Sequence, residues 1–192
     1  MAIEVTRLSK SYGDLPVIDD LSFHLPERGV VAVTGRSGSG KTTLLHLLLG
    51  LIVPDSGTIT GVGRMGAVFQ EDRLIRSLSV WGNLKLVSND LPRIDEHLHK
   101  VGLHQHRNDP ISALSGGMRR RLAIARAMLY PCDAVAMDEP FKGLDVDTRA
   151  EIIDYVLQVC ADRLVLLVTH EPEELHRMNP AAVIELKGME AE

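Results

Sequence analysis

Hydrophobic residues gather in short runs that alternate with longer helical stretches along most of the chain. Three runs are almost entirely apolar, at residues 30–34, 134–137 and 164–169, and a helical pattern follows each of them. Strands that are apolar at every position are typical of a parallel sheet that is buried on both faces. The pattern therefore predicts an α/β fold with a mostly parallel sheet and helices on both faces.

Two segments depart from this pattern. Residues 3–6 and 21–25 alternate between apolar and polar side chains, with turn residues between and after them, so they predict an N-terminal antiparallel β subdomain. From Asp72 onward the chain becomes helical and polar. We therefore expect a single domain spanning residues 1–192, with a small helical subdomain inserted at approximately 72–128.

A glycine-rich loop follows the first apolar run. Residues 35–42, GRSGSGKT, fit the pattern G-x-x-x-x-G-K-[ST] between a predicted strand and a predicted helix. Glycines let backbone N–H groups wrap around phosphate oxygens, and the helix N-terminus and Lys41 add positive charge. The Thr42 hydroxyl can ligate Mg²⁺. The loop thus predicts a site for a nucleoside triphosphate, formed by Gly35, Arg36, Ser37, Gly38, Ser39, Gly40, Lys41, Thr42 and Thr43.

Polar residues also end the other two apolar runs. Asp138 and Glu139 follow the second run, and His170 follows the third. Ligands of open α/β sheets bind at the carboxyl ends of the strands, so these residues should lie near the glycine-rich loop. We expect Asp138 to hold Mg²⁺ and Glu139 to act as general base on the attacking water. His170 either orients the γ-phosphate and the water or has a structural role.

A second anion site is predicted at residues 114–118, LSGGM. Ser115 is a good N-cap for the helix that follows, and Gly116 and Gly117 allow a ligand to approach the helix N-terminus closely. Phosphate loops occur in kinases, GTPases and many ATPases, so the glycine-rich loop alone does not separate these classes of protein. The LSGGM segment is the feature that does.

With these motifs in this order, the sequence resembles the ATP-binding cassette (ABC) family of transporter ATPase subunits. The resemblance implies that the α/β fold is of the P-loop NTPase (RecA-like) type. The resemblance implies that Gln70 is the Q-loop glutamine, with a catalytic role and a metal-binding role, and that Asp145 belongs to the D-loop beside the nucleotide. It also implies that Tyr12 stacks on adenine. Residues 70–74 and Met118 are similar to nitrate/taurine/sulfonate-type importers, although the family's usual residue at the position of Met118 is Gln.

The resemblance further implies the assembly. Two copies of the chain would form a homodimer on ATP binding, with each ATP between the glycine-rich loop of one copy and Ser115–Gly117 of the other. Transport would need integral membrane permease subunits and a solute-binding protein. The permease contact would be a groove from Gln70 past Leu74 and Ile75 to Trp81, with core packing as the alternative for Trp81.

Composition narrows the choice of partners. The 192 residues include 21 Lys and Arg and 26 Asp and Glu, for a net charge of −5, which argues against nucleic acid as a partner. There is no apolar stretch of membrane-spanning length and no apolar signal core, and the two cysteines suggest a reducing compartment with core packing for both. We expect a cytoplasmic protein, peripheral on the cytoplasmic face of the cell membrane.

We assign no function to two clusters of basic residues. Four histidines between residues 97 and 106 are expected to be solvated, and Arg119–Arg121 are expected on a solvated or phosphate-proximal face.

Other functions remain open at this stage. A soluble ABC-type ATPase without a transport role, such as one in cofactor assembly, has the same motifs, and a P-loop small-molecule kinase would share the glycine-rich loop. Repair and chromosome ATPases are excluded because residues 43–113 leave no room for long coiled coils. Translation-type cassettes carry two copies in one chain, and this chain has one.

Overall fold

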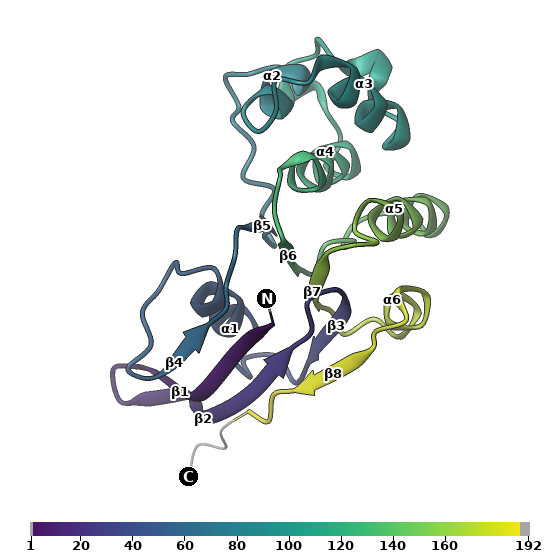
Figure 1. Ribbon diagram of the computed structural model, residues 1–192. Helices are drawn as coiled ribbons and strands as arrows, with labels where there is room; N and C mark the ends of the chain where they lie inside the picture. Colours follow the sequence, from purple (N-terminus) through teal and green to yellow (C-terminus); the bar gives the residue numbers. More distant parts are fainter. Residues whose placement is uncertain (1, 189–192) are drawn as a thin grey trace.

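Two β-sheets and the helices around them make up residues 2–188, the part of the chain that the computed structural model describes (Figure 1). The larger sheet is parallel, with the strand order β5-β6-β7-β3-β8. Its strands are β3 (Gly29–Thr34), β5 (Met65–Val68), β6 (Ala134–Asp138), β7 (Leu164–Val168) and β8 (Ala182–Glu185). The predicted α/β fold is confirmed.

The apolar runs form the centre of this sheet, and successive residues face two separate cores. On β7, Leu164 and Leu166 pack in one hydrophobic cluster, whereas Val165 and Leu167 pack in the other. The residues of β6 alternate in the same way. Because side chains on a strand point alternately to its two faces, a strand with both faces buried has to be apolar throughout.

An antiparallel sheet and one helix cover the first face. The strand order is β2-β1-β4, and helix α1 (Lys41–Leu48) packs against the parallel sheet through Leu44, Leu45, Leu47 and Leu48. The strands are β1 (Ile3–Tyr12), β2 (Leu15–Leu25) and β4 (Ser56–Thr60). This sheet is not purely N-terminal, because β4 follows α1. The patterns of β4, β5 and β8 gave no strand prediction, since these strands are short and β4 and β8 are mostly exposed.

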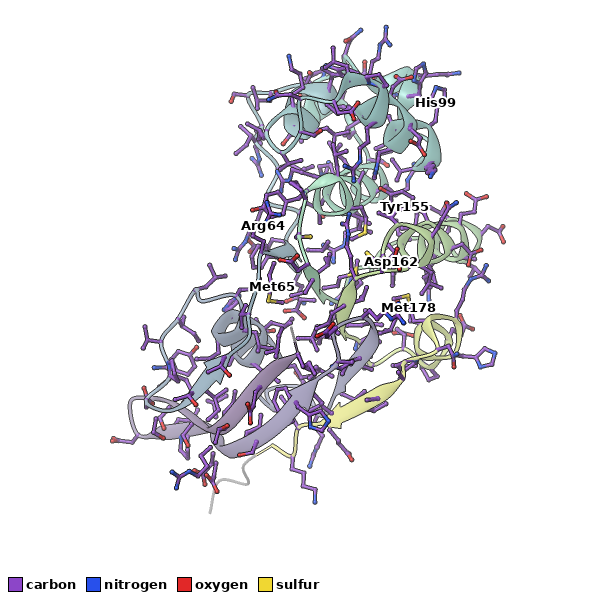
Figure 2. All side chains as sticks on the ribbon, in the orientation of Figure 1. Arg64, Met65, His99, Tyr155, Asp162 and Met178 are labelled. Carbon is purple, nitrogen blue, oxygen red and sulfur yellow. The ribbon has the colours of Figure 1, made fainter. Side chains whose placement is uncertain are left out.

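Helices cover the second face and extend beyond it. Helices α2, α3 and α4 lie together at the end of the molecule farthest from the antiparallel sheet, and α5 and α6 lie along the parallel sheet (Figure 1). Met178 of α6, labelled in Figure 2, is buried in this core. The helices are α2 (Val80–Lys85), α3 (Leu91–Lys100), α4 (Gly116–Leu129), α5 (Val146–Val159) and α6 (Pro172–Met178), with short 3₁₀ turns at His104–His106 and Ile111–Ala113. Among residues 2–188, no helix has both the length and the hydropathy to cross a membrane.

Two of the expectations about surface residues are wrong. His97 was expected in solvent and Arg120 on a solvated or phosphate-proximal face, but both are buried, each 4% exposed. The reason is that each has specific partners inside the protein: His97 Nδ1 lies 2.6 Å from the hydroxyl of Tyr155 on α5 (labelled in Figure 2), and Arg120 binds backbone carbonyls. Cys132 and Cys160 are buried free thiols, as expected.

The contact between His97 and Tyr155 predicts a pH-dependent stability. Burial lowers the pKa of His97 from 6.5 to about 4, since the charged imidazolium would lose its hydration. The unfolded chain therefore takes up this proton at a higher pH than the folded protein does. The free energy of unfolding should fall as the pH decreases from about 6.5 to about 4, by about 3 kcal/mol from this group.

Chemical denaturation across this pH range would measure the effect. His97→Gln keeps a polar group beside Tyr155 but cannot take up a proton, so its stability should depend less steeply on pH than that of the wild type. Equal slopes for the two proteins would contradict the assignment to His97.

Candidate active site

A cleft of about 730 Å³ opens at the carboxyl edge of the parallel sheet. It lies where β3, β6 and β7 end, next to the loop that connects β3 to α1. This is the edge where open α/β sheets bind ligands. The residues that line the cleft are Val17, Gly35, Arg36, Ser37, Gly38, Gly40, Lys41, Thr42, Thr43, Gln70, Asp138, Glu139, Lys142 and His170.

The glycine-rich loop needs glycine at two crowded positions. Gly40 has a φ of 91° as the N-cap of α1, and a Cβ there would lie 2.8 Å from Cγ1 of Val17. Gly35 has a φ of 143°, and a Cβ there would lie 2.6 Å from Oγ of Ser39. Both backbone angle and space therefore exclude a larger residue. The loop reaches the N-terminus of α1 in a shape that no other residue type would allow.

Lys41 and Thr42, the first residues of α1, place their polar groups at this loop. Lys41 Nζ donates hydrogen bonds of 2.8 Å to the carbonyls of both Gly35 and Arg36. Thr42 Oγ1 donates to Oδ2 of Asp138 at 2.7 Å, and Asp138 is only 6% exposed. The sequence separates Thr42 from Asp138 by almost a hundred residues, but the parallel sheet brings them into contact.

The Glu139 carboxylate lies among three polar side chains. His170 Nδ1 is 3.4 Å from Oε1, while Gln70 Nε2 and Lys142 Nζ are 3.4 and 3.0 Å from Oε2. Partial burial would raise the pKa of Glu139, but the hydrogen bond and charge of Lys142, together with His170 and Lys41, lower it below its ordinary value. The carboxylate is thus held ionised at neutral pH, in the form that can accept a proton.

The structure brings most of the predicted site residues to one cleft, but not all of them. Ser39 is buried beneath the loop, and its N–H donates to the carbonyl of Arg36. Tyr12 is exposed at the end of β1 and does not line the cleft. The lining also does not include Ser115, Gly116, Gly117 and Asp145.

These last residues form a second surface. Ser115 caps α4 by accepting a hydrogen bond from the N–H of Met118 at 3.2 Å, and Asp145 caps α5 in the same way from Thr148 at 3.0 Å. A Cβ on Gly117 would meet Cδ2 of Leu144 at 3.6 Å, so the starts of the two helices are neighbours. The predicted second anion site is therefore a surface that the chain's own cleft does not include.

Sequence reasoning missed two residues of the cleft. Lys142 comes three residues after Glu139, and a basic residue so close to a predicted catalytic carboxylate was a usable signal. Val17 comes from β2, and nothing in the sequence marks it. Both line the cleft, and Lys142 pairs with Glu139.

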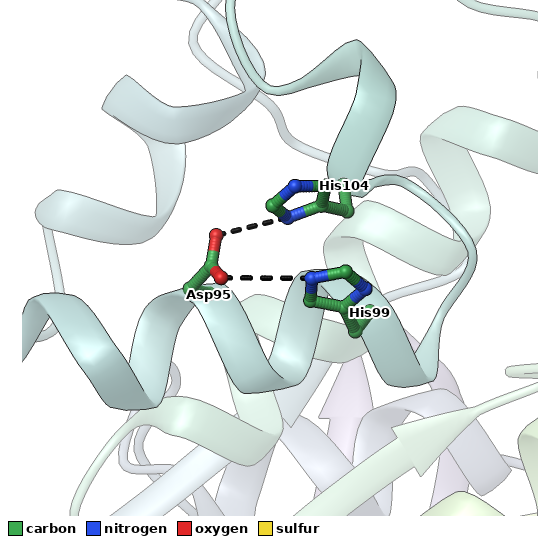
Figure 3. Close-up of side chains that lie close together, drawn as sticks. All are labelled: Asp95, His99 and His104. Atoms are coloured by element: carbon green, nitrogen blue, oxygen red, sulfur yellow. Dashed lines mark ion pairs between the residues drawn. The ribbon is translucent and has the colours of Figure 1, made fainter.

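The histidine cluster has one further arrangement. Asp95 on α3 forms ion pairs with His99 at 3.6 Å and with His104 at 2.9 Å (Figure 3). These three side chains could hold a metal ion by distance alone. However, the two imidazole rings stack at 3.7 Å with an angle of 17° between their planes, so their lone pairs do not converge, and Arg107 lies 3.9 Å from Asp95. We therefore interpret the cluster as an ion-pair network that joins α3 to the turn after it.

A phosphate loop and a strand-end carboxylate pair at one sheet edge define the class of P-loop nucleoside triphosphatases. The sequence model of the ABC transporter family matches residues 18–142. The chain belongs to the ABC transporter family, and it is an ATP-binding protein with ATPase activity.

Curated relatives from bacteria agree with this assignment. The chain is 37% identical to "Aliphatic sulfonates import ATP-binding protein SsuB 1" of Nocardia farcinica, across 98% of this chain and 79% of that protein. It is 36% identical to "Nod factor export ATP-binding protein I" of Ralstonia nicotianae, across 92% of this chain but only 61% of that protein. A solved structure, "Structure of a bacterial Atm1-family ABC exporter with ATP bound", has the same fold, with a TM-score of 0.88 at 20% identity, over 98% of this chain and 38% of that one.

The pairing of Glu139 with Lys142 predicts a change in the pH profile of ATP hydrolysis. With Glu139 as the expected base, hydrolysis falls as the pH drops through its pKa. Lys142→Ala removes a hydrogen bond and a charge that lower this pKa, so the acid limb of the profile should move to higher pH.

Steady-state ATPase rates between about pH 3.5 and about pH 9, a range that includes the acid limb of a carboxylate with a lowered pKa, would measure the shift. Lys85→Ala, an exposed lysine at the end of α2, is the matched control and should leave the profile in place. An unshifted acid limb in Lys142→Ala would contradict the electrostatic role of Lys142.

Proposed function

We propose that this chain is the ATP-hydrolysing subunit of a transporter, and that it dimerises on ATP and drives solute import through separate membrane permease subunits. It would act as one nucleotide-binding domain over residues 1–192, with a helical subdomain at about 72–128. Its place would be the cytoplasmic face of the cell membrane. A solute-binding protein would complete the importer.

One observation supports the proposed dimer: the two predicted phosphate-binding surfaces of the chain are separate from each other. One copy offers the cleft, with the glycine-rich loop, and the surface at Ser115–Gly117 lies outside it. A capped helix N-terminus with glycines is suited to an anion. In a head-to-tail homodimer, each copy would supply its Ser115–Gly117 surface to the ATP in the cleft of the other, with Asp145 near the junction.

Within the cleft, each side chain has a proposed task in hydrolysis. Lys41 and the loop N–H groups would bind the β- and γ-phosphates, and Glu139 would accept a proton from the attacking water at a carboxylate oxygen. His170 and Gln70, both 3.4 Å from that carboxylate, would hold the water and the γ-phosphate in line. Tyr12, which is exposed at the end of β1, would stack on adenine.

The oxygen donors of the cleft fit Mg²⁺. The Thr42 hydroxyl and the buried Asp138 carboxylate lie 2.7 Å apart beside the loop, and Gln70 lines the same cleft. A hard cation that prefers oxygen ligands matches this donor set. When bound, Mg²⁺ would neutralise charge on the phosphates.

The import direction and the solute class rest on similarity. The relatives named for aliphatic sulfonate import support an importer, in line with the resemblance at residues 70–74, whereas relatives named for Nod factor export favour the opposite direction. A small anionic solute such as a sulfonate is the leading choice. The second candidate is an ABC-type ATPase without a transport role.

The proposed permease contact lies along the Q-loop side of the helical region. Ile75 is exposed there, whereas Leu74 and Trp81 are partly buried against the core. Trp81 thus serves core packing, and Ile75 is the apolar side chain of this group that a partner could cover.

Substitution of the proposed base tests both hydrolysis and dimerisation. Glu139→Gln removes the proton acceptor with little change in shape, so ATP hydrolysis should fall by about 100-fold or more while ATP binding persists. Because the ATP is no longer consumed, this variant should form a stable dimer with ATP, measurable by light scattering after gel filtration.

Two further variants make this result interpretable. Glu96→Gln is the same change at an exposed site on α3 and should leave hydrolysis unaffected. Gly117→Asp, where a side chain has space, puts a negative charge on the second anion surface and should abolish the dimer of Glu139→Gln. Near wild-type turnover by Glu139→Gln would refute the base assignment.

Co-expression with candidate permeases separates transport from the alternative function. The chain should co-purify with a membrane permease encoded beside it, and Ile75→Asp should weaken that complex without lowering the ATPase rate of the isolated chain. If the chain binds no permease and hydrolyses ATP independently, the function without transport is the better interpretation.

A further inference from the structure

Arg120, in the second turn of α4, uses its whole guanidinium on backbone carbonyls. It is 4% exposed, and each of its three nitrogens donates hydrogen bonds. The acceptors are the carbonyl oxygens of Pro140 (2.6 Å from Nε), Phe69 and Gln70 (2.5 and 3.3 Å from Nη1), and Asp138 and Glu139 (3.1 and 2.6 Å from Nη2).

These acceptors come from two separate catalytic segments. Phe69 and Gln70 begin the loop after β5, and the other three residues form the end of β6 and the turn after it. Asp72 Oδ1 lies 3.5 Å from Nη1 and supplies the opposite charge. The planar fork of an arginine can bind several oxygens in fixed directions at once, which a lysine cannot do.

The other arginines of α4 do not share this arrangement. Arg119 donates to the carbonyl of Leu114, Arg121 to that of Val101, and Arg126 to those of Asp72 and Arg73. Within residues 2–188, none of these three arginines donates a hydrogen bond to residues 138–140. Within the described chain, Arg120 is the arginine of this helix that joins the Gln70 loop to the Glu139 turn.

The backbone of Glu139 needs such a support. Its φ is 44°, in the left-handed region, which is strained for a residue with a Cβ and persists only when the surroundings hold it. The N–H of Glu139 donates to the carbonyl of Val168 at 2.9 Å, and its carbonyl accepts from Arg120 at 2.6 Å. The peptide groups on both sides of the strained Cα are therefore fixed.

We propose that Arg120 is a positioning residue for hydrolysis, which holds Glu139 and Gln70 in one arrangement by binding both of their loops. This inference rests on the role proposed above for Glu139. Arg120 does not line the cleft, and within residues 2–188 its hydrogen bonds and ion pair do not include Lys41 or Thr42, so it acts on the step in which water attacks and not on the affinity for ATP.

Arg120 also gives α4 a direct connection to the reacting groups. The same helix begins at Ser115, the proposed contact with the ATP of the other copy. A shift of that helix start would move the guanidinium and, with it, the carbonyls of Gln70 and Glu139. Completion of the dimer would thus align the base.

Arg120→Lys is the test variant, since it keeps the positive charge beside Asp72 but loses the fork. We expect kcat for ATP hydrolysis to fall by roughly 10- to 100-fold, as for other displaced catalytic groups, with the dissociation constant for ATP changed by less than about threefold. An unchanged kcat, or a loss explained by weaker ATP binding, would overturn the proposal.

Arg163→Lys is the matched control for loss of stability. Arg163 Nη1 donates to the carbonyls of Met128 and Tyr130 at the far end of α4, so the same substitution removes hydrogen bonds from a guanidinium to backbone carbonyls without touching either catalytic loop. Thermal unfolding of both variants would compare their stabilities. Arg163→Lys should keep the wild-type kcat, and an equal loss of kcat in both variants would show a structural effect only.

A double-mutant cycle with Glu139→Gln identifies the path of the effect. If Arg120 acts by placing the Glu139 carboxylate, Arg120→Lys should reduce the residual rate of Glu139→Gln by about twofold at most. Losses that multiply would refute this path. Wild-type turnover in Glu139→Gln would instead refute the proposed base, so the two failures are distinguishable.

Discussion

Burial of both faces of the parallel sheet is the constraint on which the rest of the structure depends. Strands β3, β6 and β7 are apolar on both sides, so they offer no place for polar chemistry except beyond their ends. The glycine-rich loop, the carboxylates and His170 all lie at that edge for this reason. The hydrogen bond between Thr42 and Asp138 forms because β3 and β6, which lie on either side of β7, end at the same edge of the sheet.

The site combines an unfavourable backbone with a favourable electrostatic environment. Glu139 has a left-handed backbone, and its partial burial opposes ionisation, but Lys142, His170 and Lys41 lower its pKa. Its backbone bonds to Val168 and Arg120 compensate for the strain. The protein thus fixes the position of this carboxylate through the main chain and its charge through the side chains, by separate sets of neighbours.

The sequence predicted the parts of this arrangement that follow from local rules. Apolar runs identify the central strands, and the glycines with Lys41 and Thr42 identify the phosphate loop, because each depends on residues adjacent in the chain. The burial of His97 and Arg120 could not be predicted, since their partners, Tyr155 and the carbonyls of two loops, are distant in sequence. Strand β8 could not be predicted either, because it forms by pairing in parallel with β3, which is distant in sequence.

The alternation of side chains along the central strands also divides the interior into two compartments that share no apolar side chain. One compartment holds the buried leucines of α1, and the other holds the helices that include α4. Local opening of a protein follows its cooperative packing units, and here α1 and α4 are in different units. Helix α1, which follows the proposed phosphate-binding loop, and helix α4 therefore belong to different packing units, with the parallel sheet between them.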